Sequence, residues 1–319
     1  MKTLLVTGGA GFVGSHLCEK LISLGNKVIC IDHFDNFYDP SIKEQNIKNI
    51  IANPLFTLYR YDIRDEKKME EVFSSTNIDC VIHLAAMAGV RPSIQNPLLY
   101  EDVNVRGTNV LLEQAKNHHI KKFIFASSSS VYGNSDLVPF HEKQVVDFAI
   151  SPYAATKKAG EVICHVYHHL YQLDVAILRL FTVYGPRQRP DLAIHKFTQM
   201  IQNDEPIPFF GDGSTERDYT YVDDIVHGII MSVAYLEKNQ NVYEIFNLGE
   251  NQTISLSQMV ETIEKAVGKK AKKKMCPMQP GDVFRTYANI DKAKKYLGYQ
   301  PSTQFQKGIE NFIDWFSSN

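Results

Sequence analysis

Tyr153 and Lys157 form the clearest chemical pair in this chain. They stand four residues apart in residues 151–171, where a Ser-Pro start and the apolar spacing predict a helix. Side chains at that spacing share one face of a helix. A nearby ammonium favours the phenolate, so we expect Lys157 to lower the pKa of Tyr153 from about 10 toward neutrality. Tyr153 is therefore a candidate general base for the hydroxyl of an alcohol or sugar; the alternative is an ordinary surface pair.

Hydroxyl groups gather at the end of a predicted strand that precedes this helix. The strand covers residues 122–126 and runs into four consecutive serines, residues 127–130. Parallel α/β sheets bind ligands at the carboxyl ends of their strands. Ser128, Ser129 and Ser130 are therefore candidate binding groups, although serines in a loop can also cap the local backbone.

A glycine-rich loop near the N-terminus predicts a dinucleotide site. Gly8, Gly11 and Gly14 lie between a predicted strand and helix, where the missing Cβ atoms leave room for a tight turn and a pyrophosphate. The start of that helix attracts phosphate. Asp32 ends the next strand, where its carboxylate suits the adenosine ribose and would repel a 2′-phosphate. Because no Arg or Lys follows it before Lys43, we expect NAD rather than NADP.

Two later strand ends add candidate cofactor contacts. Asp62 follows a strand predicted over residues 56–61 and is placed to accept a hydrogen bond from the adenine amino group, unless it caps the next helix. Small residues follow the strand predicted over residues 79–86 and would let a cofactor lie against the backbone. The other predicted cofactor contacts are Phe12, Val13, Ile63, Leu84, Ala85 and Ala86.

The composition excludes several classes of protein. Of 319 residues, 44% are hydrophobic and 22% are charged, and the formal net charge is −2, so nothing draws the whole chain toward nucleic acid or a membrane surface. No apolar run is long enough to span a bilayer. The five cysteines show no paired spacing, which predicts reduced thiols in a cytoplasmic protein. No histidine pattern predicts a metal site.

The order of predicted elements indicates an α/β protein, with a Rossmann-type, doubly wound parallel sheet. We expect residues 1–180 to form the NAD-binding domain and residues 222–250 to return to it. Residues 181–221 and 251–319 are expected to form a smaller, α-rich substrate domain. The lysines of residues 269–274 lack interleaved aromatic residues, so they predict a solvated surface rather than a nucleic-acid site.

Together these motifs resemble the extended short-chain dehydrogenase/reductases, and within them the nucleotide-sugar 4-epimerases. The resemblance covers essentially the whole chain. It implies that Ser128 is the catalytic hydroxyl, Tyr153 the base and Lys157 the lysine that holds the cofactor. The motifs that carry it are Gly8-x-x-Gly11-x-x-Gly14, Asp32, Ser128, Tyr153-x-x-x-Lys157, Arg217-Asp218-Tyr219, Asn247-Leu248-Gly249 and Gly281-Asp282.

The residues before Val131-Tyr132-Gly133 discriminate between reactions in this family. Related 4,6-dehydratases carry Asp-Glu there and related UDP-glucuronate decarboxylases carry Glu, whereas this chain has Ser129-Ser130. Without a carboxyl group, the site lacks the acid for elimination. The expected reaction is reversible oxidation at C4 of a UDP-sugar, followed by rotation of the 4-keto sugar and return of the hydride to its other face.

Residues 181–193 are similar to those of UDP-glucuronate 4-epimerases, whereas UDP-glucose epimerases usually carry Asn where Thr182 stands. Hydroxyls of Ser128, Ser129, Ser130 and Thr182 could hold a C6 carboxylate through charge-assisted hydrogen bonds. UDP-glucuronate is therefore the expected substrate.

The diphosphate contacts are harder to assign from the sequence. The family often has Arg shortly before Gly281-Asp282, but this chain has Gln279. The resemblance then leaves Arg217 first, and Arg285, Arg189 or Lys196 as alternatives, for the diphosphate, with Asp282 as a further substrate contact.

Two other functions stay open: a 4-epimerase of UDP-glucose or UDP-N-acetylglucosamine, and a non-catalytic NAD-binding sensor. The resemblance also implies a homodimer through the helices predicted near residues 100–118 and 152–171. These helices carry apolar residues beyond one core-facing stripe. The residues are Val105, Leu112, Val162, Val166 and Leu170.

Overall fold

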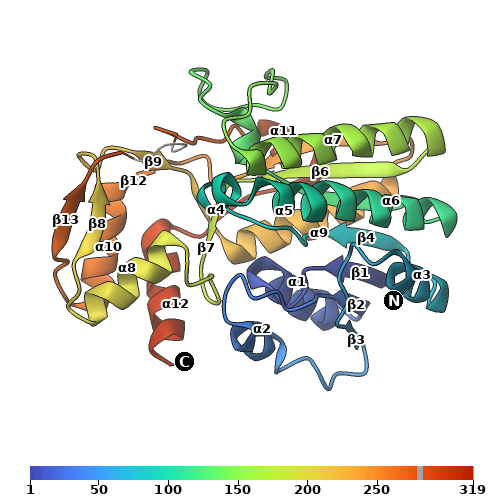
Figure 1. The fold of residues 1–319 in the computed structure, drawn as a ribbon, viewed down its shortest axis with the longest axis horizontal. Helices are drawn as coiled ribbons and strands as arrows, with labels where there is room; N and C mark the ends of the chain where they lie inside the picture. The colour runs from blue at the N-terminus through green and yellow to red at the C-terminus, as the bar shows by residue number, and fades with distance from the viewer. Residues whose placement is uncertain (279–282, 319) are drawn as a thin grey trace.

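The computed structural model describes residues 1–278 and 283–318, and it has one large parallel sheet with a smaller part at one end (Figure 1). Seven strands form the sheet in the order β11-β6-β5-β4-β1-β2-β3, and every pair is parallel. The strands are β1 (Thr3–Thr7), β2 (Lys27–Ile31), β3 (Phe56–Tyr59), β4 (Cys80–His83), β5 (Lys122–Ser128), β6 (Asp174–Leu180) and β11 (Tyr243–Leu248). The predicted doubly wound sheet is confirmed.

The strands are apolar on both sides because helices cover both faces of the sheet. In β1, Leu4 and Val6 belong to the core on one face, and Leu5 belongs to the core on the other. This alternation follows from the two-residue period of a strand. The first core includes residues of α1 (Phe12–Ser23) and α9 (Val222–Lys238), and the second includes α3 (Glu66–Ser75), α6 (Gly107–Asn117) and α7 (Pro152–Tyr171).

The helix predicted near residues 100–118 is built from three successive pieces. They are α5 (Pro97–Glu101), a π-helical turn η1 (Asp102–Arg106) and α6. The turn directs Asn104 onto the segment after β4, where its side-chain amide hydrogen bonds with both backbone groups of Met87. Single π-turns inside helices often mark functional sites.

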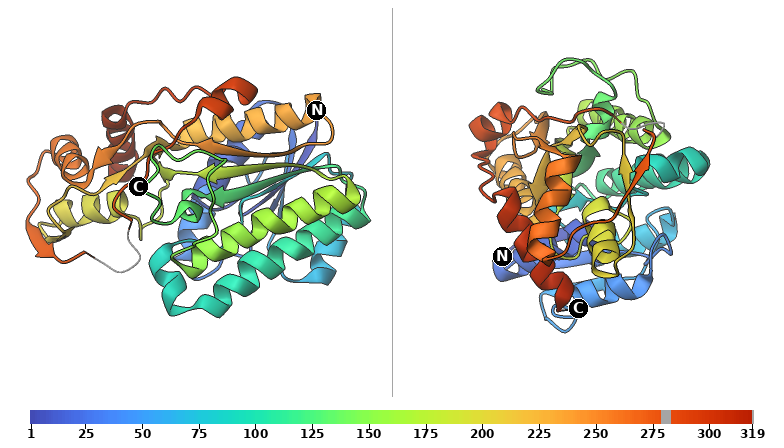
Figure 2. Two further views of the ribbon diagram at one scale, coloured as in Figure 1. Left: turned by 90° about the horizontal axis from the view of Figure 1, so that it is seen from above. Right: turned by 90° about the vertical axis from the view of Figure 1, so that its left-hand side faces the viewer.

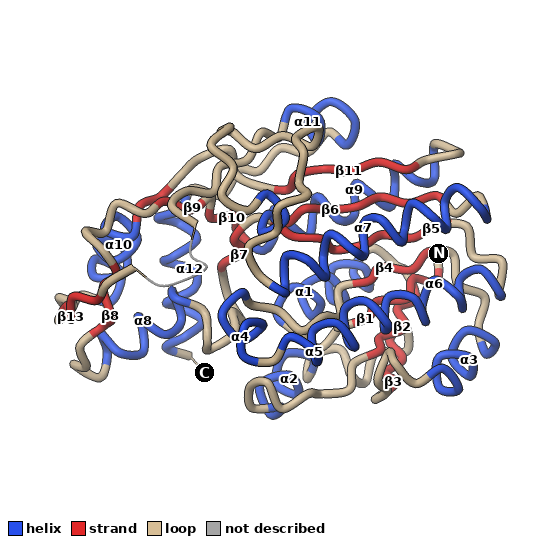
Figure 3. Tube along the Cα trace, turned by 45° about the horizontal axis from the view of Figure 1, so that its top comes forward, coloured by secondary structure: helices blue, strands red, loops and turns tan. Residues whose placement is uncertain are grey.

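The smaller part of the molecule lies beside the carboxyl ends of the strands, as the turned views show (Figures 2 and 3). It contains more strand than the sequence predicts. Its helices are α8 (Ala193–Gln202), α10 (Leu256–Val267) and α12 (Phe305–Ser317), and its strands are β8 (Ile207–Phe210), β9 (Glu216–Arg217), β12 (Ile254–Ser255) and β13 (Lys273–Cys276). β13 pairs in parallel with β8, so Lys273 and Lys274, the last lysines of the predicted solvated surface, lie in a strand.

The remaining elements connect these parts. They are α2 (Pro40–Ile47), α4 (Val90–Gln95), a 3₁₀ turn η2 (Ser129–Tyr132), β7 (Thr182–Tyr184), β10 (Tyr219–Tyr221) and α11 (Asp291–Leu297). Within the described residues, we find no helix that combines the length and the apolarity needed to cross a membrane.

Candidate active site

The glycine loop joins β1 to α1 and lines the first of two adjoining cavities among the described residues. Gly8 has φ of +71°, and a Cβ there would lie 2.8 Å from the amide nitrogen of Ala85. A Cβ on Gly14 would lie 2.1 Å from the carbonyl oxygen of Gly8. Both positions therefore exclude a side chain, and α1 starts directly against the strand with its free N–H groups facing the loop.

Asp32 lies at the end of β2 with a densely bonded carboxylate. It accepts hydrogen bonds from the backbone N–H groups of Ala10 at 3.2 Å and Phe34 at 2.9 Å. The ammonium of Lys43 on α2 lies 3.5 Å from the same carboxylate, and both side chains are buried. Lys43 stands eleven residues after Asp32 in the sequence, and its contact with the carboxylate at the predicted ribose site was not predicted.

Asp62 follows β3, lines the first cavity and forms an ion pair with Arg64. The guanidinium of Arg64 donates at 3.0 Å to Oδ1 and at 2.6 Å to Oδ2 of Asp62. Asp65, rather than Asp62, caps α3. The alternative helix-cap role of Asp62 is therefore wrong, and its contact with adenine stays a prediction.

Tyr153 and Lys157 lie on the face of α7 that covers β5, with Ser128 at the end of that strand. The Nζ of Lys157 is 6.0 Å from the ring centroid of Tyr153 and donates a 2.7 Å hydrogen bond to the carbonyl oxygen of Ala126. The ring of Tyr153 packs edge-on against Tyr100 of α5, with 6.3 Å between centroids. The predicted base, lysine and hydroxyl are thus brought together.

The pKa of Tyr153 differs from the sequence prediction. Burial raises it above 10, because a phenolate loses its solvation, while the nearby Ser128 hydroxyl and the positive charge of Arg189 act in the opposite direction. The ammonium of Lys157 is directed to the Ala126 carbonyl, and burial lowers its own pKa to about 8. The expectation that Lys157 brings the pKa of Tyr153 toward neutrality is therefore wrong for this arrangement.

The serine cluster combines both roles that the sequence left open. Ser128 accepts a hydrogen bond from the N–H of Ser130 at 3.1 Å and so caps η2. Its hydroxyl also donates to the hydroxyl of Ser130 at 3.1 Å. Ser128, Ser129, Ser130 and Thr182 of β7 nevertheless all line the same cavity, so their hydroxyls face one space.

This first cavity has a volume of about 400 Å³ and collects nearly all the predicted contacts. Most come from the carboxyl ends of β1, β2, β3, β4 and β5, around the point where the strand order reverses, as expected for an open α/β sheet, and the others come from α7 and from β7 and the segment after it. The predicted residues that line it are Gly8, Gly11, Phe12, Val13, Gly14, Asp32, Asp62, Ile63, Leu84, Ala85, Ala86, Ser128, Ser129, Ser130, Tyr153, Lys157, Thr182 and Arg189.

A second cavity of about 900 Å³ lies beside the first, toward the smaller part of the molecule. Thr182 and Leu192 line both cavities. Arg217 and Lys196 line the second cavity, and their contact with a diphosphate stays a prediction. Arg91 of α4 also lines this cavity and was not predicted; its guanidinium carbon lies 5.1 Å from the ring centroid of Phe210.

The other predicted substrate contacts are placed differently. Arg189 lines the first cavity and forms a two-pronged pair with Asp191, at 2.9 and 2.7 Å. Arg285 lines neither cavity and pairs instead with Glu216. Asp282 lies outside the described residues.

Comparison with known proteins agrees with this geometry. Residues 5–312 match the family model described as GDP-mannose 4,6 dehydratase. A UDP-glucuronate 4-epimerase from Thermodesulfobacterium geofontis is 42% identical, over 100% of this chain and 97% of that protein. The chain belongs to the extended short-chain dehydrogenase/reductases. The resemblance found in the sequence motifs is therefore confirmed.

Solved structures of this family superpose closely on the chain. The UDP-glucuronic acid 4-epimerase from Bacillus cereus, in complex with UDP-glucuronic acid and NAD, gives a TM-score of 0.92 at 38% identity and covers 99% of both chains. The UDP-glucose 4-epimerase from Thermotoga maritima, with UDP-glucose, gives 0.90 at 33% identity, again over 99% of both chains. The fold therefore matches family members with either sugar, and the site residues must distinguish them.

Proposed function

We propose that this chain is a NAD-dependent UDP-sugar 4-epimerase that converts UDP-glucuronate to UDP-galacturonate. The observation that carries the proposal is the position of Tyr153, Ser128 and Lys157 in the cofactor cavity, next to a second cavity that shares Thr182 with it. The UDP-glucuronate 4-epimerases among its relatives support the same function. A non-catalytic sensor would not need this base, hydroxyl and lysine together.

NAD fits the residues of the first cavity. The loop at Gly8 and Gly14, which a Cβ would fill, leaves room for the pyrophosphate, and Asp32 is placed for the adenosine ribose. Lys157 is placed for the nicotinamide ribose. When bound, NAD supplies the acceptor for the C4 hydride and returns the hydride to the sugar.

The chain's own residues handle the proton and the orientation of the sugar. Tyr153 takes the proton from the C4 hydroxyl, and Ser128, in the same cavity, favours the ionised form of the phenol. The 4-keto sugar must then turn over before the hydride returns. The two adjoining cavities, of about 400 and 900 Å³, provide space for this rotation while the UDP moiety stays bound. We assign diphosphate binding first to Arg217, which faces the larger cavity.

The preference for glucuronate rests on the hydroxyls that line the sugar side of the first cavity. Ser129, Ser130 and Thr182 offer neutral donors to a C6 carboxylate, and hydrogen bonds to an ionised group are the stronger kind. At residues 129–130, where related dehydratases carry acids, no charge opposes the carboxylate.

The test is to incubate purified protein with UDP-glucuronate, without added NAD, and to follow UDP-galacturonate. UDP-glucose and UDP-N-acetylglucosamine serve as parallel substrates. Turnover of UDP-glucuronate is expected without added cofactor, because a cofactor that is regenerated in each cycle need not leave. Preferential turnover of a neutral UDP-sugar would contradict the substrate assignment. If none of the three UDP-sugars is converted, the proposal that the chain is a 4-epimerase is contradicted.

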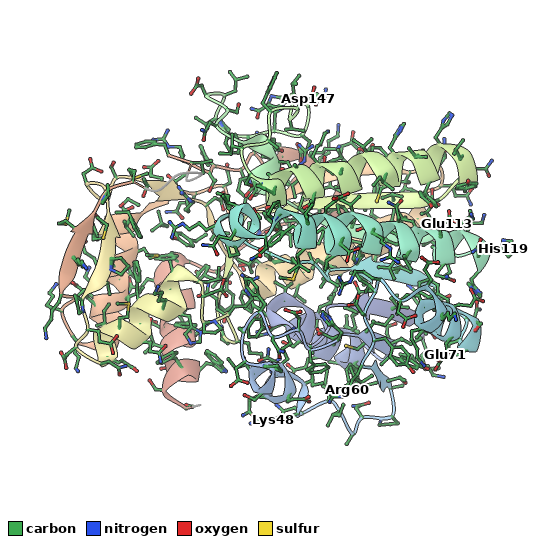
Figure 4. The ribbon with its side chains drawn as sticks, in the orientation of Figure 1. Lys48, Arg60, Glu71, Glu113, His119 and Asp147 are labelled. Atoms are coloured by element: carbon green, nitrogen blue, oxygen red, sulfur yellow. The ribbon has the colours of Figure 1, made fainter. Side chains whose placement is uncertain are left out.

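We also propose that the chain is a homodimer through α6 and α7, which lie side by side (Figure 2). On α6, Glu113 is directed toward α7 and accepts a hydrogen bond from Tyr167 (Figure 4). Val162, Val166 and Leu170 of α7 are 52%, 44% and 58% exposed, which supports a partner on this face. Sedimentation should give about twice 36.3 kDa, and a Leu170→Glu variant should shift to the monomer.

One residue predicted for this interface is excluded by the structure. The side chain of Leu112 is fully buried, because it lies on the face of α6 that packs against the sheet. Val105 is only partly exposed.

We further propose the domain division expected from the sequence, supported by the pairing of β11 with β6 in the main sheet. A cytoplasmic location is supported by the five free cysteines, four of which are buried.

A further inference from the structure

A buried ion pair between α7 and β6 contacts Ser127, the residue immediately before Ser128. Glu161 of α7 and Arg179 of β6 are each 1% exposed. Arg179 donates to Glu161 through Nε at 2.9 Å and through Nη2 at 2.8 Å. Ser127 of β5 donates to the same carboxylate at 2.6 Å. One carboxylate thus joins a helix to two neighbouring strands.

These contacts follow the register of the sheet. Ser127 and Arg179 are direct partners in the parallel pairing of β5 with β6. Glu161 lies four residues beyond Lys157 and eight beyond Tyr153, so all three side chains point from α7 toward the sheet. Glu161 therefore grips β5 at the residue immediately before Ser128.

Two neighbouring contacts bring α7 close to β5 along the same line. Lys157 donates to the carbonyl oxygen of Ala126 at 2.7 Å. A Cβ on Gly160 would lie only 2.3 Å from the ring of Phe125, so the helix rests directly on that ring. Successive residues of β5 thus meet α7, and the Glu161 contact is the one nearest to Ser128.

Stability alone does not account for this pair. Removing two charges from water costs more than a well-packed apolar pair would, and a buried ion pair is better attested as a device that fixes register. Among the described residues, Nη1 of Arg179 is buried without a hydrogen-bond partner, which adds to that cost. Neither Glu161 nor Arg179 lines the two cavities, so neither touches the substrate.

We propose that Glu161 and Arg179 are positioning residues for the epimerase reaction: they set the height of α7 over β5 and thereby fix the position of Tyr153 on α7 relative to Ser128 on β5. This inference rests on the proposed function, in which Tyr153 is the base. A displacement near 1 Å at a reacting group is enough to lower a rate about 100-fold.

The first test is Glu161→Gln, which keeps the shape of the side chain and removes its charge. We expect kcat to fall about 10- to 100-fold, with KM for UDP-glucuronate and NAD content near those of the wild type. The acidic limb of the kcat–pH profile should move to higher pH, because the neighbouring Ser128 hydroxyl lowers the pKa of Tyr153 and this effect would weaken as the two side chains separate. A kcat within about twofold of the wild type, with an unchanged pH profile, would overturn the proposal.

A double variant separates positioning from stability. Glu161→Leu with Arg179→Met replaces the pair by apolar side chains, a change that is often neutral or stabilising. We expect a Tm close to that of the wild type with kcat still reduced. Wild-type Tm together with wild-type kcat would overturn the proposal.

Asp174→Ala is the matched control, since Asp174 is a buried carboxylate at the opposite end of β6 that accepts from the N–H of Val242 at 2.7 Å. It should lower Tm and leave kcat and its pH profile unchanged. If the Glu161 variants do not fold, Ser127→Ala removes the hydrogen bond from β5 to Glu161 and must show the same shift of the pH profile; because Ser127 also lines the first cavity, NAD content is measured with it. Wild-type protein assayed in parallel keeps the two claims apart: its inactivity contradicts the proposed function, and the variant-to-wild-type ratio tests the positioning.

Discussion

At the scale of the residue, Tyr153 is partly buried and lies near two groups that stabilise its ionised form. Burial raises its pKa, and Ser128 and Arg189 oppose that effect. A tyrosine with a raised pKa can act as a general base only if neighbouring groups stabilise its phenolate during the reaction. Ser128 therefore favours ionisation of Tyr153, in addition to the sugar contact that we propose for it.

Tyr153→Phe removes only this hydroxyl. We expect epimerisation to fall by about 100- to 10,000-fold, the usual contribution of a general base, while bound NAD stays near one per chain. The measurement is the initial rate of UDP-galacturonate formation, with nucleotide content determined after denaturation. Near-normal turnover would contradict the assignment of the base.

Thr182 tests the carboxylate side of the site. Oxidation of UDP-glucuronate at C4 gives a β-keto acid, which loses carbon dioxide when its C5–C6 bond stands perpendicular to the ketone plane. Hydroxyls that grip the carboxylate would prevent this orientation. Thr182→Ala or Ser129→Ala should therefore raise the ratio of UDP-pentose to UDP-galacturonate, measured by chromatography of the products. A lower rate with an unchanged ratio would leave these hydroxyls as binding groups only.

At the scale of the element, the proposed role of the contact between α7 and β5 is to set where Tyr153 lies. Gly160→Ala places a methyl group 2.3 Å from the buried ring of Phe125, so the helix must move outward. Such overpacking costs about 1–3 kcal/mol, and we expect both Tm and kcat to fall.

Gly228→Ala of α9 is the matched control for this change. Its added Cβ would lie 2.8 Å from a methyl carbon of Leu248, in the core away from Tyr153. It should lower Tm, measured by thermal unfolding, and leave kcat close to that of the wild type. Equal losses of kcat in both variants would contradict a specific role for the α7–β5 contact.

The elements that hold NAD were predictable because their signals are local. The glycine loop, Asp32 and the Tyr153–Lys157 spacing each lie within one strand–turn–helix unit, where residue type and geometry are directly linked. The pKa of Tyr153 was not predictable, because helical spacing shows that two side chains share a face but not which acceptor the lysine reaches.

The larger cavity depends on contacts between distant parts of the chain. Phe210 of β8 meets Arg91 of α4, and β8 itself pairs with β13, more than sixty residues later. Lys43 likewise reaches Asp32 only through the fold of α2. No local pattern encodes these contacts, so sequence reasoning missed Arg91, Phe210 and Lys43 as site residues.

At the scale of the whole molecule, a buried acidic cluster ties together loops of the smaller part and the sheet. Asp218 accepts from the N–H groups of Glu250 at 2.7 Å and Ala288 at 3.1 Å, and burial raises its pKa to about 6. Burial, with the charges of Asp224 and Asp218, raises the pKa of Glu250 to about 8. Among the described residues, Oε2 of Glu250 is buried without a hydrogen-bond partner.

This cluster predicts a pH-dependent stability. A carboxyl whose pKa is higher in the folded than in the unfolded chain contributes stability that is complete below its unfolded pKa and is lost as pH rises through the folded value. Tm should therefore decline between about pH 5 and 8, and Glu250→Gln should flatten the decline. The measurement is Tm across this range, where about 1 kcal/mol corresponds to a few degrees. Parallel curves for wild type and variant would contradict this role of Glu250.

The most direct test of the reaction itself follows the hydrogen at C4. Wild-type protein is incubated, without added NAD, with UDP-glucuronate that carries deuterium at C4, and the product is examined by mass spectrometry and NMR. Transfer to a bound cofactor and return within the same site predict UDP-galacturonate that keeps its deuterium at C4. Product that has lost the deuterium to solvent, or the absence of any epimer, would contradict the account.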